Sequence, residues 1–210
     1  MAEQYVSAFA IDDAAVFGLV GSDDDVPVRM ALAKIRDLST ADRLLRATDP
    51  GDVETALREI VTGSLDPGRS GGYGWLLELI GPTLGSPLGH VVLPGRGWDR
   101  LEGAFRSWDL AASADLWARP WPFPWSPAGP HPDPDPWPFP MFASPDELDR
   151  IHDELAAFDT DRIHTDADDF LPDEDDAEEV EWLLADNLPG WVSGARAQGL
   201  GMLLIRDGGR

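Results

Sequence analysis

The chain has 210 residues, 43% of them hydrophobic and 9% aromatic, which is the composition of a folded globular protein and excludes an intrinsically disordered one. It contains no cysteine, and this excludes disulfide bonds, a thiol nucleophile and thiolate metal sites. The formal net charge of −23, from 39 acidic and 16 basic residues, argues against nucleic-acid binding, because that binding depends on lysine and arginine.

The N-terminal part of the chain is expected to form a strand and then helices. Residues 4–11 combine β-branched, aromatic and apolar side chains on both faces, as in a strand that is buried on both sides. A short helix is expected over residues 13–20, and the acidic loop at 21–25 is expected to cap a further helix. Apolar residues then recur at helical spacing from Asp52 until Gly63 ends the pattern.

The middle of the chain predicts the most buried helix. Residues 73–84 are apolar almost all round, as in a central helix, and Glu78 is a carboxylate on it. A short strand is expected at 90–93. The aromatic and leucine side chains of residues 98–118 recur at roughly helical spacing, which indicates one or two short helices.

A proline- and tryptophan-rich segment covers residues 120–140, in which the string PWPFP occurs twice. Proline at alternate positions disfavours helix and central strand and favours polyproline II. Four nearby indoles, if all were exposed, would form an apolar patch larger than a monomer usually shows. We therefore expect the segment to wrap the body of the domain with its rings covered; the alternative is a surface for a partner protein.

The C-terminal third begins with a helix whose start is well marked, because Ser144, Pro145 and Glu147 form a capping box. An acidic linker is expected at 159–176, followed by a helix that Pro189 kinks or restarts. A final apolar strand closes the chain. The whole pattern predicts one α+β domain over residues 1–210, with a small central sheet that includes the N- and C-terminal strands and is packed by several helices.

No motif of known chemistry is present. Gly95-Arg96-Gly97 lacks the third glycine of a dinucleotide-binding loop, because Arg100 stands at that position. His152 and His164 lie among carboxylates, but neither shows the spacing of known metal ligands. We predict no catalytic residue, no metal site and no cofactor.

A ligand, if one binds, is expected near the helix at 71–80. Glu78 is either a buried carboxylate of raised pKa, suited to acid–base chemistry, or the wet edge of its helix. The residues predicted to bind are Tyr73, Trp75, Glu78, Trp98, Trp121 and Trp137.

The order of these elements resembles a known group of proteins. The strings that carry the resemblance are ALREIVTG at 56–63, GGYGWLLELIGPTLGSPLG at 71–89 and MFASPDELDRIHDEL at 141–155. They resemble an uncharacterised family of actinobacterial proteins and are distantly similar to the YfbM-like group. The resemblance implies no catalytic residues, and some similar small acidic bacterial proteins act as immunity partners of toxins.

The acidic charge is uneven and suggests a function. Residues 141–190 hold 18 acidic residues against Arg150 and Arg162. Three functions fit: a non-catalytic, immunity-like interaction module that binds a basic protein; a small-molecule-binding or enzymatic domain with a pocket near residues 71–80; or a nucleic-acid mimic. No signal peptide or membrane span is evident, so we expect a cytoplasmic protein.

Overall fold

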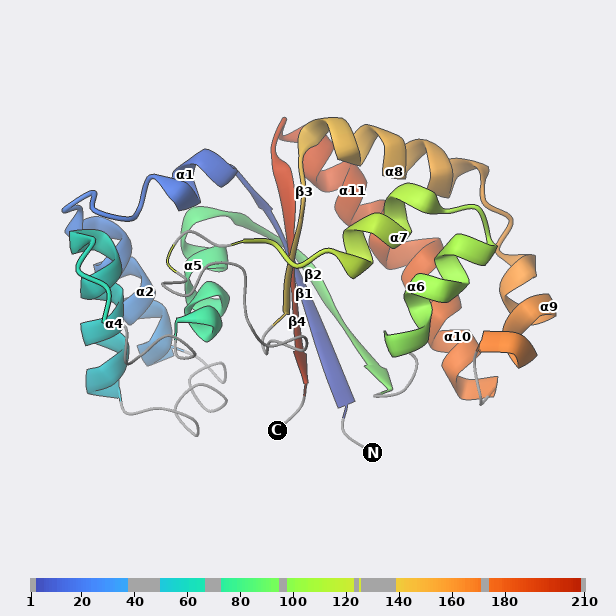
Figure 1. Cartoon of the computed structure of the whole chain (residues 1–210), viewed down its shortest axis with the longest axis horizontal. Helices are drawn as coiled ribbons and strands as arrows, with labels where there is room; N and C mark the ends of the chain where they lie inside the picture. Colours follow the sequence, from blue (N-terminus) through green and yellow to red (C-terminus); the bar gives the residue numbers. More distant parts are fainter. Residues whose placement is uncertain are drawn as a thin grey trace. The chain divides into compact units, whose positions relative to one another are not determined.

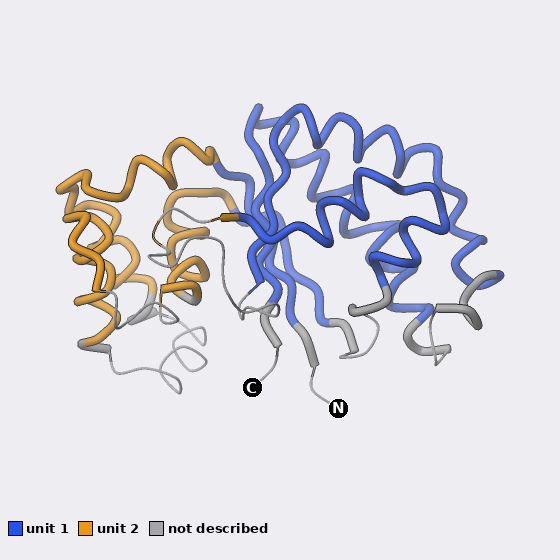
Figure 2. The backbone as a smooth tube through the Cα atoms, viewed as in Figure 1, with its two compact units in different colours: residues 1–11, 87–121, 137–210 blue, residues 12–86, 122–136 orange. Residues whose placement is uncertain are grey.

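The structure is a computed structural model, and it describes residues 3–37, 50–66, 73–94, 98–122, 125, 139–170 and 174–208 (Figure 1). Contacts divide the chain into two compact units (Figure 2). Unit 1 contains residues 1–11, 87–121 and 137–210, and unit 2 contains residues 12–86 and 122–136. Each unit has buried apolar side chains of its own. The expectation of a single domain stays a prediction.

Unit 1 is built on one four-stranded sheet. Its strands are β1 (Glu3–Ile11), β2 (Ser86–Pro94), β3 (Phe139–Ala143) and β4 (Gly201–Gly208). Their order is β2-β1-β4-β3, and β4 pairs antiparallel with both β1 and β3. The first and last strands are therefore the two central ones. This confirms the predicted α+β class and the predicted place of both terminal strands in the sheet.

The side chains of β1 explain its central position. Val6, Ala8 and Ala10 belong to the main apolar core of unit 1, and Phe9 and Ile11, which alternate with them, are buried too. A strand with both faces buried needs apolar residues at consecutive positions, as the sequence predicted.

Strand β3 was not predicted, because it contains Pro140 and follows a proline-rich stretch. Proline cannot donate a ladder hydrogen bond, but it is tolerated in an edge strand. Here β3 is the edge strand, and Pro140 stands opposite Ile205. The amide of Trp121 donates to the carbonyl of Pro140 at 2.7 Å, so the proline-rich segment runs beside this edge at that point.

The helices of unit 1 lie to one side of its sheet (Figure 1). They are α6 (Trp98–Ser107), α7 (Ala111–Ala118), α8 (Pro145–Ala157), α9 (Asp161–Phe170), α10 (Glu174–Trp182), the π-helix η3 (Leu183–Asn187) and α11 (Leu188–Ala197). Helices α8 and α11 contact the sheet and each other, and α7 contacts β3. One or two short helices were predicted within residues 98–118, and the structure has two there, α6 and α7.

The acidic linker predicted at 159–176 is instead largely helical, since α9 and the start of α10 lie in it. Few apolar positions mark these helices, and their acidic composition suggested a solvated linker. Each helix nevertheless buries an apolar side chain: Ile163 in α9 and Val180 in α10. Arg162 fixes α9 against α6, because its guanidinium donates to the carbonyls of Ser107 and Trp108 at the end of that helix.

The predicted effect of Pro189 is confirmed and has a clear form. A proline in a helix removes one N–H and crowds the carbonyl four residues earlier. The chain responds with the π-helical turn η3 just before α11, whose first turn holds Pro189. The amide of Leu188 donates to the carbonyl of Leu183, and the Asn187 side chain donates to the Trp182 carbonyl at 3.1 Å.

Unit 2 is helical. Its elements are α1 (Asp13–Phe17), α2 (Asp25–Asp37), α4 (Pro50–Thr62), the 3₁₀-helix η2 (Gly74–Leu76) and α5 (Leu77–Leu84). Helix α5 is buried at Leu77, Leu79 and Ile80, which confirms the helix predicted over 73–84. Helix α1 is shorter than predicted, and strand β2 begins at Ser86 rather than near residue 90. Lys34 of α2 donates to the carbonyl of Pro82 in α5.

Candidate functional site

The residues predicted to bind a ligand divide between the two units. Those in unit 2 are Tyr73, Trp75 and Glu78, and those in unit 1 are Trp98 and Trp121. Trp75 lies in η2, and Trp98 is the first residue of α6. Trp137 lies outside the described residues.

Tyr73 has a structural environment within unit 2. Its side chain is 0% exposed, and its hydroxyl donates to the Glu59 carboxylate at 2.5 Å. The same hydroxyl accepts from the amide of Asp66 at 2.8 Å, and the Tyr73 carbonyl accepts from the indole of Trp125 at 3.2 Å. Tyr73 thus connects α4, the residues after it and the proline-rich segment, and its ring is closed to a ligand.

Glu78 lies in the first turn of α5, next to buried Leu77 and Leu79. Its side chain is only partly buried. A carboxylate at this end of a helix interacts favourably with the helix dipole. Of the two interpretations of Glu78, the structure favours the second, in which the carboxylate lies at the solvent-facing edge of an otherwise apolar helix.

The indoles of the proline-rich region are covered wherever the structure describes them. Trp117, Trp121 and Trp125 are all buried. Trp121 stacks on Phe142 of β3 with ring centroids 5.2 Å apart, and Trp117 meets Phe105 edge to face at 5.7 Å. The prediction that these rings are shielded by the protein's own body is confirmed for these three tryptophans.

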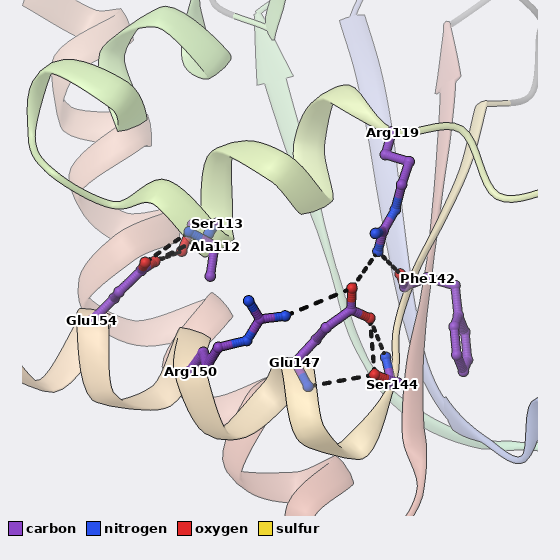
Figure 3. A network of polar contacts seen from close by, with 8 residues as sticks. All are labelled: Ala112, Ser113, Arg119, Phe142, Ser144, Glu147, Arg150 and Glu154. Atoms are coloured by element: carbon purple, nitrogen blue, oxygen red, sulfur yellow. Dashed lines mark hydrogen bonds and ion pairs between the residues drawn. The ribbon is translucent and has the colours of Figure 1, made fainter.

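The N-terminus of α8 carries a network of polar contacts (Figure 3). The capping box is present as predicted: the Glu147 amide donates to the Ser144 hydroxyl, and the Glu147 carboxylate accepts from the Ser144 amide at 2.9 Å. Arg119, which follows α7, adds an ion pair to Glu147 at 2.7 Å and donates to the Phe142 carbonyl. This network joins α7, β3 and α8.

The second carboxylate of the network is Glu154. One of its oxygens accepts from the amide of Ala112 at 2.7 Å, and the other accepts from the Ser113 amide at 3.1 Å and from the Ser113 hydroxyl (Figure 3). Helix α7 has no side-chain cap from Leu110, the residue before it. Glu154 therefore caps α7 from the neighbouring helix α8, and both carboxylates in this network hold helices in place.

The capping network gives a prediction about pH. Burial raises the pKa of the Glu147 carboxyl, but the Ser144 amide, the Arg119 guanidinium and the Ser144 hydroxyl outweigh it and hold the pKa below its ordinary value of 4.5. Because folding lowers this pKa, ionised Glu147 stabilises the fold above pH 4.5, and the contribution disappears as the pH falls through the folded-state pKa.

We therefore expect Glu147→Gln to lower the free energy of unfolding by about 1 kcal/mol at neutral pH. The difference in the free energy of unfolding between this variant and the wild-type protein should shrink when urea denaturation is repeated at pH values below the pKa of a free carboxyl group. As a control, Asp153→Asn at an exposed position of the same helix should change the free energy of unfolding at neutral pH by no more than about 0.5 kcal/mol. A difference for Glu147→Gln that grows in acid would contradict this account.

The surface of α10 and η3 combines negative charge with one exposed aromatic ring. We define the α10 surface as Glu178, Glu181, Trp182 and Asp186. Glu178 stands three residues before Glu181 and four before Trp182, and Asp186 stands four residues after Trp182. Glu178 and Asp186 are exposed, and Glu181 is paired with His164 of α9 at 2.8 Å. Trp182 is 51% exposed. The sequence held one indication of this exposure, because Trp182 stands outside the apolar stripe of its helix.

The family model of a domain of unknown function, DUF7691, matches residues 2–206. The chain belongs to this family. The match covers the described helices of both units, strands β1 to β3 and all but the last two residues of β4. No curated protein and no solved structure matches the chain.

A pocket of about 450 Å³ lies in unit 1 of this DUF7691 protein. It lies between the start of α8 and the end of α11, and its lining includes Asp149, Ser193 and Arg196. The Arg196 guanidinium and the Asp149 carboxylate pair with each other at 2.8 Å across it. Of the residues predicted to bind a ligand, those whose side chains the structure describes, Tyr73, Glu78 and Trp121, are not among the lining residues.

Proposed function

We propose that this DUF7691 protein is a non-catalytic, immunity-like interaction module that binds a basic protein through its acidic C-terminal third. The observation that carries the proposal is the distribution of charge on unit 1. Residues 141–190 hold 18 acidic residues against Arg150 and Arg162. On α8, α9 and α10, and between α8 and α9, the exposed acidic residues include Asp146, Asp153, Asp159, Asp161 and Glu178.

The arginines on and beside these helices support this proposal because carboxylates or carbonyls of the chain already accept from most of them. Arg150 is exposed and lies 4.0 Å from Glu147. Arg119 pairs with Glu147, Arg196 pairs with Asp149, and Arg162 donates to two backbone carbonyls. Negative charge is thus the main outward character of these helices. A surface of one sign accelerates the encounter with a partner of the opposite sign and selects against partners of the same sign.

The burial of Tyr73, Trp121 and Trp125 supports the proposal in a second way, because it removes those rings from a site near residues 71–80. Among the described residues, no helix is long and apolar enough to cross a membrane. A cytoplasmic location, an actinobacterial origin and a likeness to the YfbM-like group remain predictions.

The proposal predicts that the immobilised protein captures a basic protein, and that its affinity for the purified partner falls steeply between about 50 mM and about 300 mM salt. Neutralising the α10 surface by Glu178→Gln, Glu181→Gln and Asp186→Asn should weaken the binding. The matched control neutralises three acidic residues of unit 2 and changes the net charge equally: Asp13→Asn, Asp23→Asn and Asp52→Asn. Absence of capture at low salt, or equal effects of the two triple variants, would contradict the proposal.

A further inference from the structure

Trp182 differs from the other tryptophans of unit 1. Among the residues whose side chains the structure describes, Trp108, Trp117, Trp121 and Trp191 are buried, whereas Trp182 is 51% exposed. It is the one large apolar side chain that unit 1 exposes among those described residues. Exposing half of an indole leaves a large apolar area in water, and tryptophan is enriched among the residues that dominate binding energy at interfaces.

The backbone of Trp182 is held in place although its side chain is exposed. Its carbonyl accepts a hydrogen bond from the Asn187 side chain at 3.1 Å, and the next residues, Leu183 and Leu184, are buried in the core. The residue is the last of α10, directly before the π-helical turn η3. Turns of this kind often occur at functional sites. A ring on a fixed backbone loses little entropy when a partner binds it.

The charges around the ring indicate what the partner presents. Residues 174–187 contain seven acidic residues and neither lysine nor arginine. Glu178 precedes Trp182 by one helical turn and Asp186 follows it by four residues, and both are exposed. On the neighbouring helix α9, the basic side chains already have partners: His164 contacts Glu181, and Arg162 donates to carbonyls at the end of α6.

We propose that Trp182 is the anchor of the α10 surface, and that it receives an arginine side chain of the basic partner. The planar guanidinium stacks on the face of the indole while Glu178 and Asp186 accept its charge. An uncharged aromatic or aliphatic partner would leave those carboxylates without compensation for lost water. This inference rests on the proposed function and names the chemistry of its partner.

The test uses the full-length protein and two synthetic peptides of equal length and charge, one arginine-rich and one lysine-rich. Binding is measured by fluorescence anisotropy of the labelled peptides at low and at higher salt. We expect the wild-type protein to bind the arginine peptide more tightly than the lysine peptide. Trp182→Ala should weaken binding of the arginine peptide about tenfold and abolish the preference, with the salt dependence unchanged. The affinity of Trp182→Phe for the arginine peptide should lie between those of the wild-type protein and Trp182→Ala.

The possible failures are distinguishable. If the wild-type protein binds neither peptide at low salt, the proposed acidic interaction surface is itself wrong. If the wild-type protein binds both with strong salt dependence and Trp182→Ala binds them equally well, the surface stands and the anchor is refuted. If Trp182→Ala weakens both peptides by the same factor, the ring supplies only apolar contact and the arginine specificity is refuted. Circular dichroism of the variants establishes that they are folded.

Discussion

Replacing Trp125 by alanine is expected to lower the free energy of unfolding by about 3–5 kcal/mol. The indole is 0% exposed, and its N–H donates to the Tyr73 carbonyl at 3.2 Å. The substitution removes a large apolar side chain from a packed interior and leaves a cavity, and it deprives a buried carbonyl of its donor. Urea denaturation followed by far-ultraviolet circular dichroism measures the loss.

Trp182→Ala is the matched control, because it makes the same chemical change at an exposed indole. It should alter the free energy of unfolding by no more than about 0.5 kcal/mol. If Trp125→Ala and Trp182→Ala changed the free energy of unfolding by equally small amounts, Trp125 would not be buried in solution. That result would favour the alternative hypothesis, in which the aromatic rings of the proline-rich segment form a surface for a partner protein.

Replacing Gly89 by alanine is expected to cost about 3 kcal/mol or more. Gly89 of β2 has φ +155°, a conformation that residues with a side chain rarely adopt. A Cβ at this position would lie 2.5 Å from Nε1 of Trp191, whose ring is buried in α11. Backbone strain and overlap with the indole therefore add, and the packing of α11 on this strand must change.

The control for Gly89 is Gly190→Ala, at an exposed position of unit 1. Gly190 lies in α11, and an added Cβ would meet no atom within 4 Å. Since alanine favours helix over glycine, this variant should be as stable as the wild-type protein or more stable by about 0.5–1 kcal/mol. Thermal unfolding of both variants compares them directly. A Gly89→Ala protein as stable as Gly190→Ala would show that β2 does not approach Trp191 in this way.

The elements with strong local patterns could be predicted from the sequence. The capping box at Ser144 and Glu147, the apolar helix α5 and the two terminal strands each depend on spacing within a short window. Strand β3 could not be predicted in this way, because a proline within it is acceptable only at an edge, and edge position is a property of the whole sheet. Helix α9 was missed because its few apolar residues gave no clear period.

The candidate site was harder to predict than the fold. Tyr73 was singled out beside a run of glycines, but its hydroxyl is used to join α4 to the segment after it. Trp121 was chosen for its unusual segment, and it stacks within unit 1 on Phe142. Trp182 was passed over because it lies among carboxylates outside an apolar stripe. Exposure depends on which faces the other elements cover, and a single sequence does not state that.

The central pairing of β1 with β4 has a consequence for folding. Gln4 is matched with Gly208 and Ile11 with Gly201, so the middle of the sheet joins two segments that lie far apart in the sequence. Contacts between such distant segments form slowly, because a very long loop must close first. Until β4 pairs with it, β1 has an open edge lined by apolar side chains, and partly folded molecules with such an edge are prone to aggregate.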